Sequence, residues 1–533
     1  MKKFELFSFV IVTALAISCL TIFYARTTET KHLDSVFLFE ASGSIIKTGQ
    51  PTSSSISTLE AALPNYSKKA AEVCSLPLLP NSVPYNVLDN HAYFILYPIS
   101  VISFLIGPDL TFAFLNSLSH VLLIALPFLF IRLWGGGVIS GLSMSIIIAL
   151  YPGLYLSAVG DYYLDRLAMP AILLFLFSLH HSIRTKIPLY SSSGMLVLML
   201  ISALFAILCT ERAAIMILAT TLFHLAFFPK IRQDRKTFWL LLSLSSFVVL
   251  YLVVYFFYIY VGITGGGGLL KNMVSISERY RSPGLVPFLL VNALSFLVLI
   301  LFSGWRYQLL AVGSMVPNFM ITMGGAELNG WSTHYHTMYM PYLVGASTFG
   351  MIFIQDRLTF PIFKNVVFPI LFAVFAFMSS LVLDPSKGSL GYPRFDYLKQ
   401  SVFYKSTVLL LFPSTSAELA ISKSLRILDL TVAKGTRVSA VEGVMPALYR
   451  NRELYLFPIG IDQADYLVVS GTVSSQGDIL FQNFLSYHGE TENTAQNVGF
   501  LKRSLMNGFV LHKHIPALGV IIMKRPNVKD QLE

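Results

Sequence analysis

Long apolar segments recur between residues 6 and 383, and they constrain the fold of this chain more than any other feature. A helix rises 1.5 Å per residue, so about 20 apolar residues cross the roughly 30 Å hydrocarbon core of a bilayer. Only 12% of the residues are charged, whereas soluble proteins have about 25%. We therefore expect an α-helical polytopic membrane protein with about 11 transmembrane helices, near residues 6–24, 111–131, 137–158, 167–183, 193–209, 213–228, 238–260, 285–303, 308–323, 338–354 and 366–383.

Charge and cysteine content exclude two further classes of protein. The chain has 38 Lys and Arg against 28 Asp and Glu, but the basic residues lie in short loops between apolar segments, which favours membrane insertion and not nucleic-acid binding. Its 3 cysteines, Cys19, Cys74 and Cys209, cannot form a disulfide framework or a thiolate metal site. The first apolar segment has no small-x-small cleavage motif after Tyr24, so we expect it to be retained as a span.

The orientation of the chain depends on the segment 92–107, which is apolar but short and contains Pro98. If this segment crossed the membrane, the basic cluster Lys230–Lys236 would lie opposite the N-terminal lysines, against the positive-inside rule. If it lies in the outer interface, both groups are inside. We therefore expect a first outer loop, 25–110, that carries interfacial helices. The expected location is the inner (plasma) membrane, with the outer loops facing the periplasm or the cell exterior.

The apolar spans end near residue 383, and the composition then becomes mixed. Residues 416–428 have the pattern of a helix. Short apolar stretches predict buried strands at 454–458, 466–470, 509–512 and 519–524. We therefore expect two domains, a transmembrane domain, 1–384, and a small extracytoplasmic α/β domain, 385–533.

Charged and aromatic side chains are concentrated in the loops that this topology places outside. Loops at span ends that carry both carboxylates and guanidinium groups are suited to binding a lipid-borne substrate at the membrane face. Alternatively, such residues can form ion pairs with one another and bind no substrate, as Glu211 and Arg212 could. The candidate substrate-binding residues are Asp161, Asp165, Arg166, Glu211, Arg212, Arg279, Tyr280, Arg281, His334 and His336.

Asp34 follows the first span after a short linker and begins the stretch Asp34–Pro51. Two explanations account for an aspartate at this place. It could cap the N-terminus of the helix that the following apolar residues predict. Alternatively, it could supply a carboxylate at the membrane face for chemistry on a lipid-borne substrate. The residues alone leave both explanations open.

Several short motifs follow one another along nearly the whole chain. They are the stretch Asp34–Pro51, the aromatic segment His91–Pro98, Asp161-Tyr162, Glu211, Arg279-Tyr280, His334-Tyr335 and a C-terminal run from Arg437 to Val468. Their order resembles a bacterial family of membrane proteins of unassigned function that is related to the GT-C class of polyprenyl-phosphate-sugar-dependent glycosyltransferases. Two positions depart from the family pattern, since Tyr163 stands where a histidine is expected and Asp165 where a glutamate is usual. These departures argue against a metal site in that loop.

The resemblance implies a GT-C-like fold and the inverting transfer of a sugar from polyprenyl phosphate or pyrophosphate to a glycan, lipid or protein acceptor. Asp34 would be the base that accepts the proton of the acceptor hydroxyl. Arg279 and Arg281 would hold the donor phosphate, with Arg166 or Arg212 as alternatives, because a guanidinium grips two oxygens at once. A divalent cation, Mg²⁺ or Mn²⁺, is left open, since the two outer-loop histidines lack a third ligand.

Two other functions remain open from the sequence. A transporter or flippase of lipid-linked sugars would also need an outer cavity lined by charged and aromatic residues, and inverted repeats would distinguish it. The sequence shows no convincing internal repeat. A non-catalytic relative that acts in membrane assembly through its C-terminal domain would carry the same motifs, and an assay of sugar transfer separates it from an enzyme.

Overall fold

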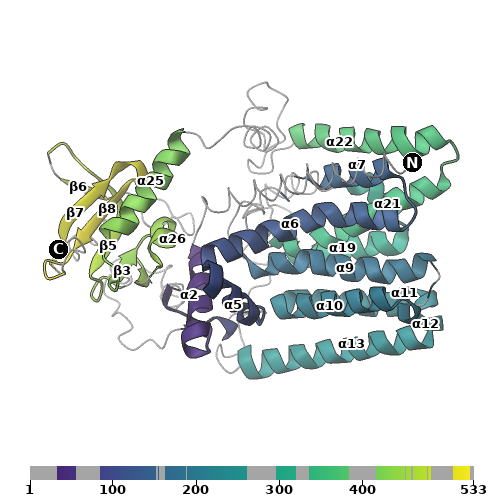
Figure 1. Cartoon of the computed structure of the whole chain (residues 1–533), viewed down its shortest axis with the longest axis horizontal. Helices are drawn as coiled ribbons and strands as arrows, with labels where there is room; N and C mark the ends of the chain where they lie inside the picture. The colour runs from purple at the N-terminus through teal and green to yellow at the C-terminus, as the bar shows by residue number, and fades with distance from the viewer. Residues whose placement is uncertain are drawn as a thin grey trace. The chain divides into compact units, whose positions relative to one another are not determined.

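The structure is a computed structural model that describes residues 33–55, 85–89, 91–149, 151, 154, 162–185, 187, 189–260, 296–319, 335–382, 416–450, 452–457, 460–476, 478–481 and 508–528. These residues are mostly helical and form two compact units. One unit is a bundle of helices, and the other contains a β-sheet (Figure 1). The bundle comprises the described residues of Leu88–Leu96 and Leu110–Phe412, and the second unit those of Lys31–Val87, Tyr97–Asp109 and Pro413–Glu533.

Helices overlap every predicted span that contains described residues, whereas the first predicted span, 6–24, lies outside them. By length and composition, three described segments can cross a membrane, namely Pro108–Leu133, Leu164–Thr185 and Arg235–Tyr258. The total of eleven spans stays a prediction. The bundle helices are α6 (Pro108–Leu133), α7 (Val138–Ala149), α9 (Leu164–Thr185), α10 (Ser193–Cys209), α11 (Glu211–Phe227), α12 (Pro229–Gln233), α13 (Arg235–Val254), α18 (Val298–Phe302), α19 (Trp305–Phe319), α21 (Met340–Arg357) and α22 (Phe368–Val382).

Close packing inside the bundle depends on small residues of α21. Gly350 lies so close to the carbonyl oxygen of Leu299 in α18 that a Cβ would collide with it, and a Cβ at Gly345 would meet the Leu176 side chain of α9 at 2.5 Å. Small residues let membrane helices approach closely, and van der Waals packing then replaces contact with lipid tails. The apolar window of α9 is 72% buried, whereas that of Arg235–Tyr258 is only 22% buried. Helix α13 therefore lies at the periphery of the bundle and offers much of its surface to lipid.

The second unit is built on a six-stranded sheet. Strands β4, β3 and β5 are parallel, and β5, β8 and β7 continue the sheet as antiparallel neighbours, with β6 paired to β5. The α/β character and the four predicted strands are confirmed, whereas β3 and β6 were not predicted, because both are short and β3 is half polar. The elements are α25 (Ser416–Thr431), β3 (Arg437–Ala440), α26 (Met445–Leu448), β4 (Glu453–Leu456), β5 (Tyr466–Val473), β6 (Ile479–Phe481), β7 (Val510–Ile515) and β8 (Val520–Lys524).

Helix α2 (Leu33–Thr48), from the predicted first outer loop, packs against this α/β domain. Val36 is fully buried in the same hydrophobic cluster as Leu428 of α25. The ring of Phe39 lies 4.8 Å from that of Tyr449, measured between centroids. The first outer loop therefore contributes apolar side chains to the core of the C-terminal domain. The predicted boundary at 384–385 falls outside the described residues and stays a prediction.

Glu40 ties the end of this loop segment to α2. Its Oε2 accepts hydrogen bonds from the hydroxyls of Ser53 at 2.6 Å and Ser55 at 2.8 Å, and from the backbone N–H of Ser55 at 3.0 Å. Burial raises the pKa of the Glu40 carboxyl, and these donors oppose that rise. The contacts hold strand β1 (Thr52–Ser53) beside α2, where it pairs with β2 (Tyr85–Asn86).

Helix α5 (Leu96–Ile106) covers most of the segment that decides the predicted orientation. Its 11 residues rise about 17 Å, which is too short to cross a hydrocarbon core of roughly 30 Å. The side chains of Phe104 and Leu105 are 72% and 74% exposed. A short helix with exposed apolar side chains fits the predicted place in the membrane interface. Just after α5, Asp109 pairs with Arg450 of the same unit at 2.7 Å.

The predicted topology has a direct test in reporter fusions. Alkaline phosphatase fused after Lys387 is expected to be active, because an inside N-terminus and eleven spans place this residue outside. A cytoplasmic reporter at the same place is expected to be inactive. The reverse result would contradict the topology and would move the acidic loops to the inner face.

Candidate functional site

Glu211 is the first residue of α11, and its carboxylate collects three hydrogen bonds. Its Oε1 lies 2.9 Å from Nδ1 of His91. Its Oε2 accepts from the backbone N–H of Ala92 at 3.0 Å and from the hydroxyl of Thr210 at 3.2 Å. Because an ionised carboxylate only accepts hydrogen bonds, the proton in the first contact belongs to His91. Glu211 thereby fixes the segment that starts at His91 to the bundle.

Two further contacts hold this segment. The backbone N–H of Ile95 donates to the carbonyl of Leu208 at 2.8 Å. The ring of Phe94 lies 6.0 Å from that of Tyr251, between centroids, in an edge-on arrangement. Part of the predicted first outer loop is therefore attached to the ends of α10, α11 and α13.

Arg212 links the starts of two helices. Its Nη1 lies 3.6 Å from Oδ2 of Asp165 in the first turn of α9, and its Nε lies 3.9 Å from Oε1 of Glu211. Both carboxylates lie at helix N-termini, where the helix dipole stabilises negative charge. The chain runs along α9 and returns along α10 before α11 starts, so α9 and α11 begin at the same end of the bundle. The structure therefore brings the starts of these two helices together, while their predicted position outside the membrane stays a prediction.

Asp165 differs from Glu211 because its carboxylate accepts no hydrogen bond from the part of the chain that the structure describes. The residue is only 2% exposed, and its 3.6 Å contact with Arg212 is longer than a hydrogen bond. A buried acceptor without a donor costs about 1–3 kcal/mol. Hydroxyl groups or water at this position would remove the cost. Asp165 is therefore the carboxylate of the cluster that is available to a ligand.

Arg166 directly follows Asp165 in the sequence and is, after Arg212, the second cation near the start of α9. Its side chain is fully buried, and its guanidinium carbon lies 5.0 Å from the centroid of the Tyr163 ring. This distance is typical of a cation–π interaction. Tyr163, which departs from the family pattern, thus supplies a ring that stabilises a buried charge.

The structure brings together four of the predicted site residues, Asp165, Arg166, Glu211 and Arg212, at the starts of α9 and α11. Asp34 belongs to the other unit, where its backbone lies in α2 and its side chain falls outside the described part. His336 lies in a 3₁₀ turn, Tyr335–Met338, and its side chain is likewise not described. The remaining predicted residues lie outside the described ranges, namely Asp161, Arg279, Tyr280, Arg281 and His334.

Metal binding was left open by the sequence. Among the described residues, no group of three or more His, Cys, Asp or Glu side chains is arranged to hold a metal ion. Since several candidate ligands lie outside these ranges, the requirement for Mg²⁺ or Mn²⁺ stays open.

His91 is a site residue that the sequence did not identify as one. It was part of an aromatic motif, and Glu211 was a separate motif 120 residues further on. No local pattern links two positions so far apart. A loop histidine close to an apolar segment was the available signal, but it did not indicate its partner.

The fold is similar to that of ArnT from Cupriavidus metallidurans, as seen in its crystal structure in the apo state. At the level of the fold, this similarity supports the predicted relation to the GT-C class of glycosyltransferases. The TM-score is 0.52 with 11% sequence identity, over 96% of this chain and 97% of that chain. This similarity and the three helices able to cross a bilayer support a membrane location.

A weaker similarity is found to the archaeal oligosaccharyltransferase AglB from Archaeoglobus fulgidus, solved in complex with an inhibitory peptide and a dolichol-phosphate. Its TM-score is 0.38 with 11% identity, over 90% of this chain and 75% of that chain, which is too low to establish a common fold. No family model and no curated protein sequence matches the chain.

Proposed function

We propose that this protein is an integral membrane glycosyltransferase that transfers a sugar from a polyprenyl-phosphate-linked donor to an extracytoplasmic glycan, lipid or protein acceptor. The observation that carries the proposal is the buried Asp165 carboxylate without hydrogen-bond donors, at the helix starts where the predicted outer loops meet, in a chain with the fold of ArnT. The fold alone does not define an activity, and the Asp165 carboxylate supplies the chemical group that a substrate could contact.

Asp165 has the chemistry to recognise a sugar. A carboxylate accepts hydrogen bonds at two oxygens, and sugar hydroxyls are donors that can fill both. Bonds to a charged group contribute more than neutral ones, and the buried site strengthens them further. The guanidinium of Arg212, at 3.6 Å, places a positive charge beside this carboxylate.

The proposed transfer is a single displacement with inversion. The oxygen of the acceptor hydroxyl forms a bond to the anomeric carbon of the sugar, while the bond from that carbon to the phosphate oxygen breaks. The electron pair of the broken bond stays on the polyprenyl phosphate, and the hydroxyl proton moves to the carboxylate of Asp34. This assignment uses Asp34 as general base, and it leaves polyprenyl phosphate and the glycosylated acceptor as products.

Arg279 and Arg281 remain the proposed ligands of the donor phosphate. Of the two alternatives, Arg166 and Arg212, the structure argues against Arg212, because its guanidinium lies within 4 Å of two carboxylates, at 3.6 Å from Asp165 and 3.9 Å from Glu211. Much of its positive charge is therefore already compensated. An arginine that stabilises a leaving phosphate needs charge that is not yet paired.

Asp165→Asn is expected to lower kcat/KM for sugar transfer by about 10- to 100-fold, because bonds to a charged group contribute roughly 1.5–3 kcal/mol and 1.36 kcal/mol is a factor of ten. The free energy of unfolding is expected to stay the same or rise, since a buried charge without hydrogen bonds is removed. The assay follows release of polyprenyl phosphate from a panel of polyprenyl-phosphate hexoses and pentoses by the purified protein.

The matched control is Asp356→Asn, which removes the partner of Arg184 at the far end of α9 and α21 and is expected to leave transfer unchanged. Equal rates for wild type and Asp165→Asn would reassign Asp165 to structure. A wild-type protein that moves labelled polyprenyl-phosphate sugar across vesicles without cleaving it would replace the transferase by a flippase.

A further inference from the structure

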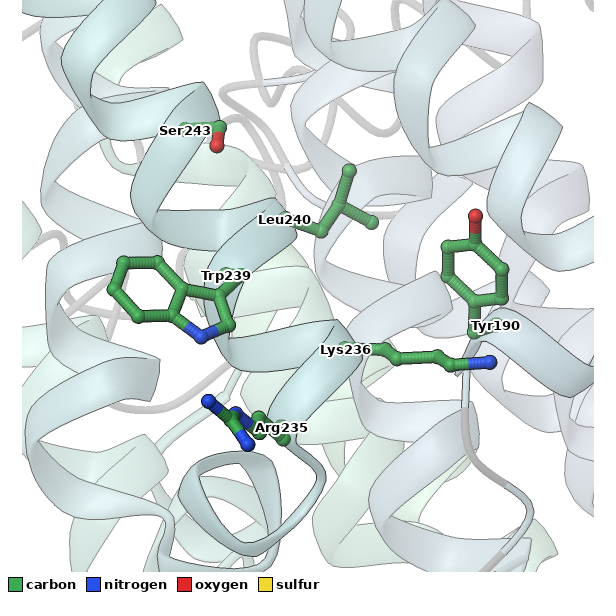
Figure 2. Close-up of a pocket in the computed structure, with 6 residues that line it drawn as sticks. All are labelled: Tyr190, Arg235, Lys236, Trp239, Leu240 and Ser243. Carbon is green, nitrogen blue, oxygen red and sulfur yellow. The ribbon is translucent and has the colours of Figure 1, made fainter.

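A groove lies at the start of α13, at the end of the bundle opposite to the cluster formed by Asp165, Glu211 and Arg212. Helix α11 begins at Glu211 in that cluster and ends at Phe227, after which α12 and α13 follow at the far end. The groove has a volume of about 580 Å³ and is open to the surface, within the range of roughly 300–1,000 Å³ for small-ligand sites. The residues that line it are Tyr190, Arg235, Lys236, Trp239, Leu240 and Ser243 (Figure 2).

The polar side-chain groups around this groove are hydrogen-bond donors, and no acceptor among the described residues binds them. The ammonium group of Lys236 lies 5.1 Å from the centroid of the Tyr190 ring. Among the described residues, neither Lys236 nor Arg235 forms an ion pair, and the hydroxyls of Tyr190 and Ser243 and the indole N–H of Trp239 make no hydrogen bond. The groove therefore combines two cations with three neutral donors.

Among the described residues, the nearby carboxylate of Asp234 forms no ion pair with Arg235 or Lys236. Asp234 caps α13, accepting from the backbone N–H of Lys236 at 3.3 Å and from the hydroxyl of Thr237. The preceding helix α12 adds Lys230 and Arg232 to the same end of the bundle. A site with several donors and an excess of positive charge selects an anion with several oxygen acceptors, and a phosphate group has this chemistry.

The wall beyond the groove is apolar and exposed. Trp239 is 54% exposed, and on the same helix Phe247 and Leu250 are 50% and 62% exposed. Arg235–Tyr258 is long and apolar enough to cross a bilayer, so its first turns lie at the depth of the lipid headgroups. Tryptophan and tyrosine are enriched at that depth. The ligand is thus expected to have an anionic head at Arg235 and Lys236 and an apolar tail along α13.

We propose that this groove binds the phosphate headgroup of an anionic membrane phospholipid, with its acyl chains lying along the exposed face of α13. The two cations contact the phosphate, and Tyr190, Trp239 and Ser243 donate to its oxygens and to those of the glycerol. Basic pockets beside transmembrane helices have this role in general. A freely diffusing anion would leave the apolar wall uncovered, whereas a phospholipid covers it. The proposal is independent of the glycosyltransferase function.

Tryptophan quenching by brominated lipids tests the proposal on the full-length protein in vesicles. A chain with Trp134→Phe, Trp305→Phe and Trp331→Phe keeps Trp239 as its one reporter. Brominated phosphatidylglycerol is expected to bind at this residue about 10- to 30-fold more tightly than brominated phosphatidylcholine, since each cation near the surface contributes about 1 kcal/mol. Arg235→Gln/Lys236→Gln is expected to abolish this preference.

The matched control is Arg357→Gln/Lys364→Gln, which removes two charges from the same end of the bundle and is expected to keep the preference. Because three tryptophan substitutions could disturb folding, phosphatidylglycerol retained by the chain with all its tryptophans is also measured by native mass spectrometry, with the same Arg235 and Lys236 comparison. Equal binding of both lipids, or an unchanged preference in Arg235→Gln/Lys236→Gln, overturns the proposal. Displacement of the lipid by millimolar inorganic phosphate would define a site for free anions instead.

Discussion

Asp34→Asn is expected to insert and fold like the wild-type chain while sugar transfer falls by about 10²- to 10⁴-fold, the usual share of general-base catalysis. Asparagine has nearly the size of aspartate and caps helices about equally well. It cannot accept the proton of the acceptor hydroxyl, so only the chemical step is removed. The measurement compares release of polyprenyl phosphate by the two purified proteins at saturating donor and acceptor.

The comparison with Asp34→Ala separates catalysis from capping. If Asp34 were only a helix cap, the asparagine variant would be nearly silent, and the alanine variant would lose about 1 kcal/mol of stability. A purified asparagine variant with wild-type transfer would end the case for Asp34 as base. Asp161 would then be the next residue to replace.

Glu211→Ala is expected to lower the free energy of unfolding by about 3–5 kcal/mol, the usual result of removing one partner from a buried charged contact. The donors of His91, Ala92 and Thr210 would lose their acceptor, and Arg212 would lose one of its two carboxylates. The measurement is denaturant unfolding of the purified protein in detergent.

Asp356→Ala is the matched control for this experiment. It also removes a carboxylate that pairs with an arginine, but the side chain of Asp356 is 51% exposed, and exposed ion pairs contribute about 1 kcal/mol or less. A loss in Glu211→Ala no greater than in this control would show that the contacts around Glu211 add nothing to stability. In Glu211→Gln, which keeps one acceptor oxygen without the charge, we expect an intermediate loss.

The helices and the buried strands could be predicted because their signals are local. Helices such as α9 and α10 are long runs of apolar residues, and β5 and β8 are short ones with branched side chains. Strand β3 was not predicted because its four residues, Arg437–Ala440, contain only two apolar side chains. It is buried because β4 and β5 pair with it on both sides. The sequence of the segment itself does not indicate these neighbours.

The contacts of the candidate site could likewise be predicted only in part from the sequence. The meeting of Asp165 with Arg212 could be expected, because consecutive membrane helices alternate in direction and so return every second helix start to one face. The contact of His91 with Glu211 could not, since it depends on how a loop folds back onto the bundle. The difference between a satisfied Glu211 and an unsatisfied Asp165 also appears only in three dimensions, because it depends on which donors surround each group.

The burial of α2 in the C-terminal core has a consequence for the order of synthesis. Leu428, in the same cluster as Val36, leaves the ribosome almost four hundred residues after it. At roughly 5–20 residues per second, the ribosome needs about 20–80 s to reach it. Throughout this interval the apolar face of α2 has no partner from the C-terminal domain, so the membrane surface or a chaperone must shield it. Early termination of the chain before the C-terminal domain would therefore leave behind a membrane-anchored segment with an uncovered apolar face, a substrate for quality-control proteases.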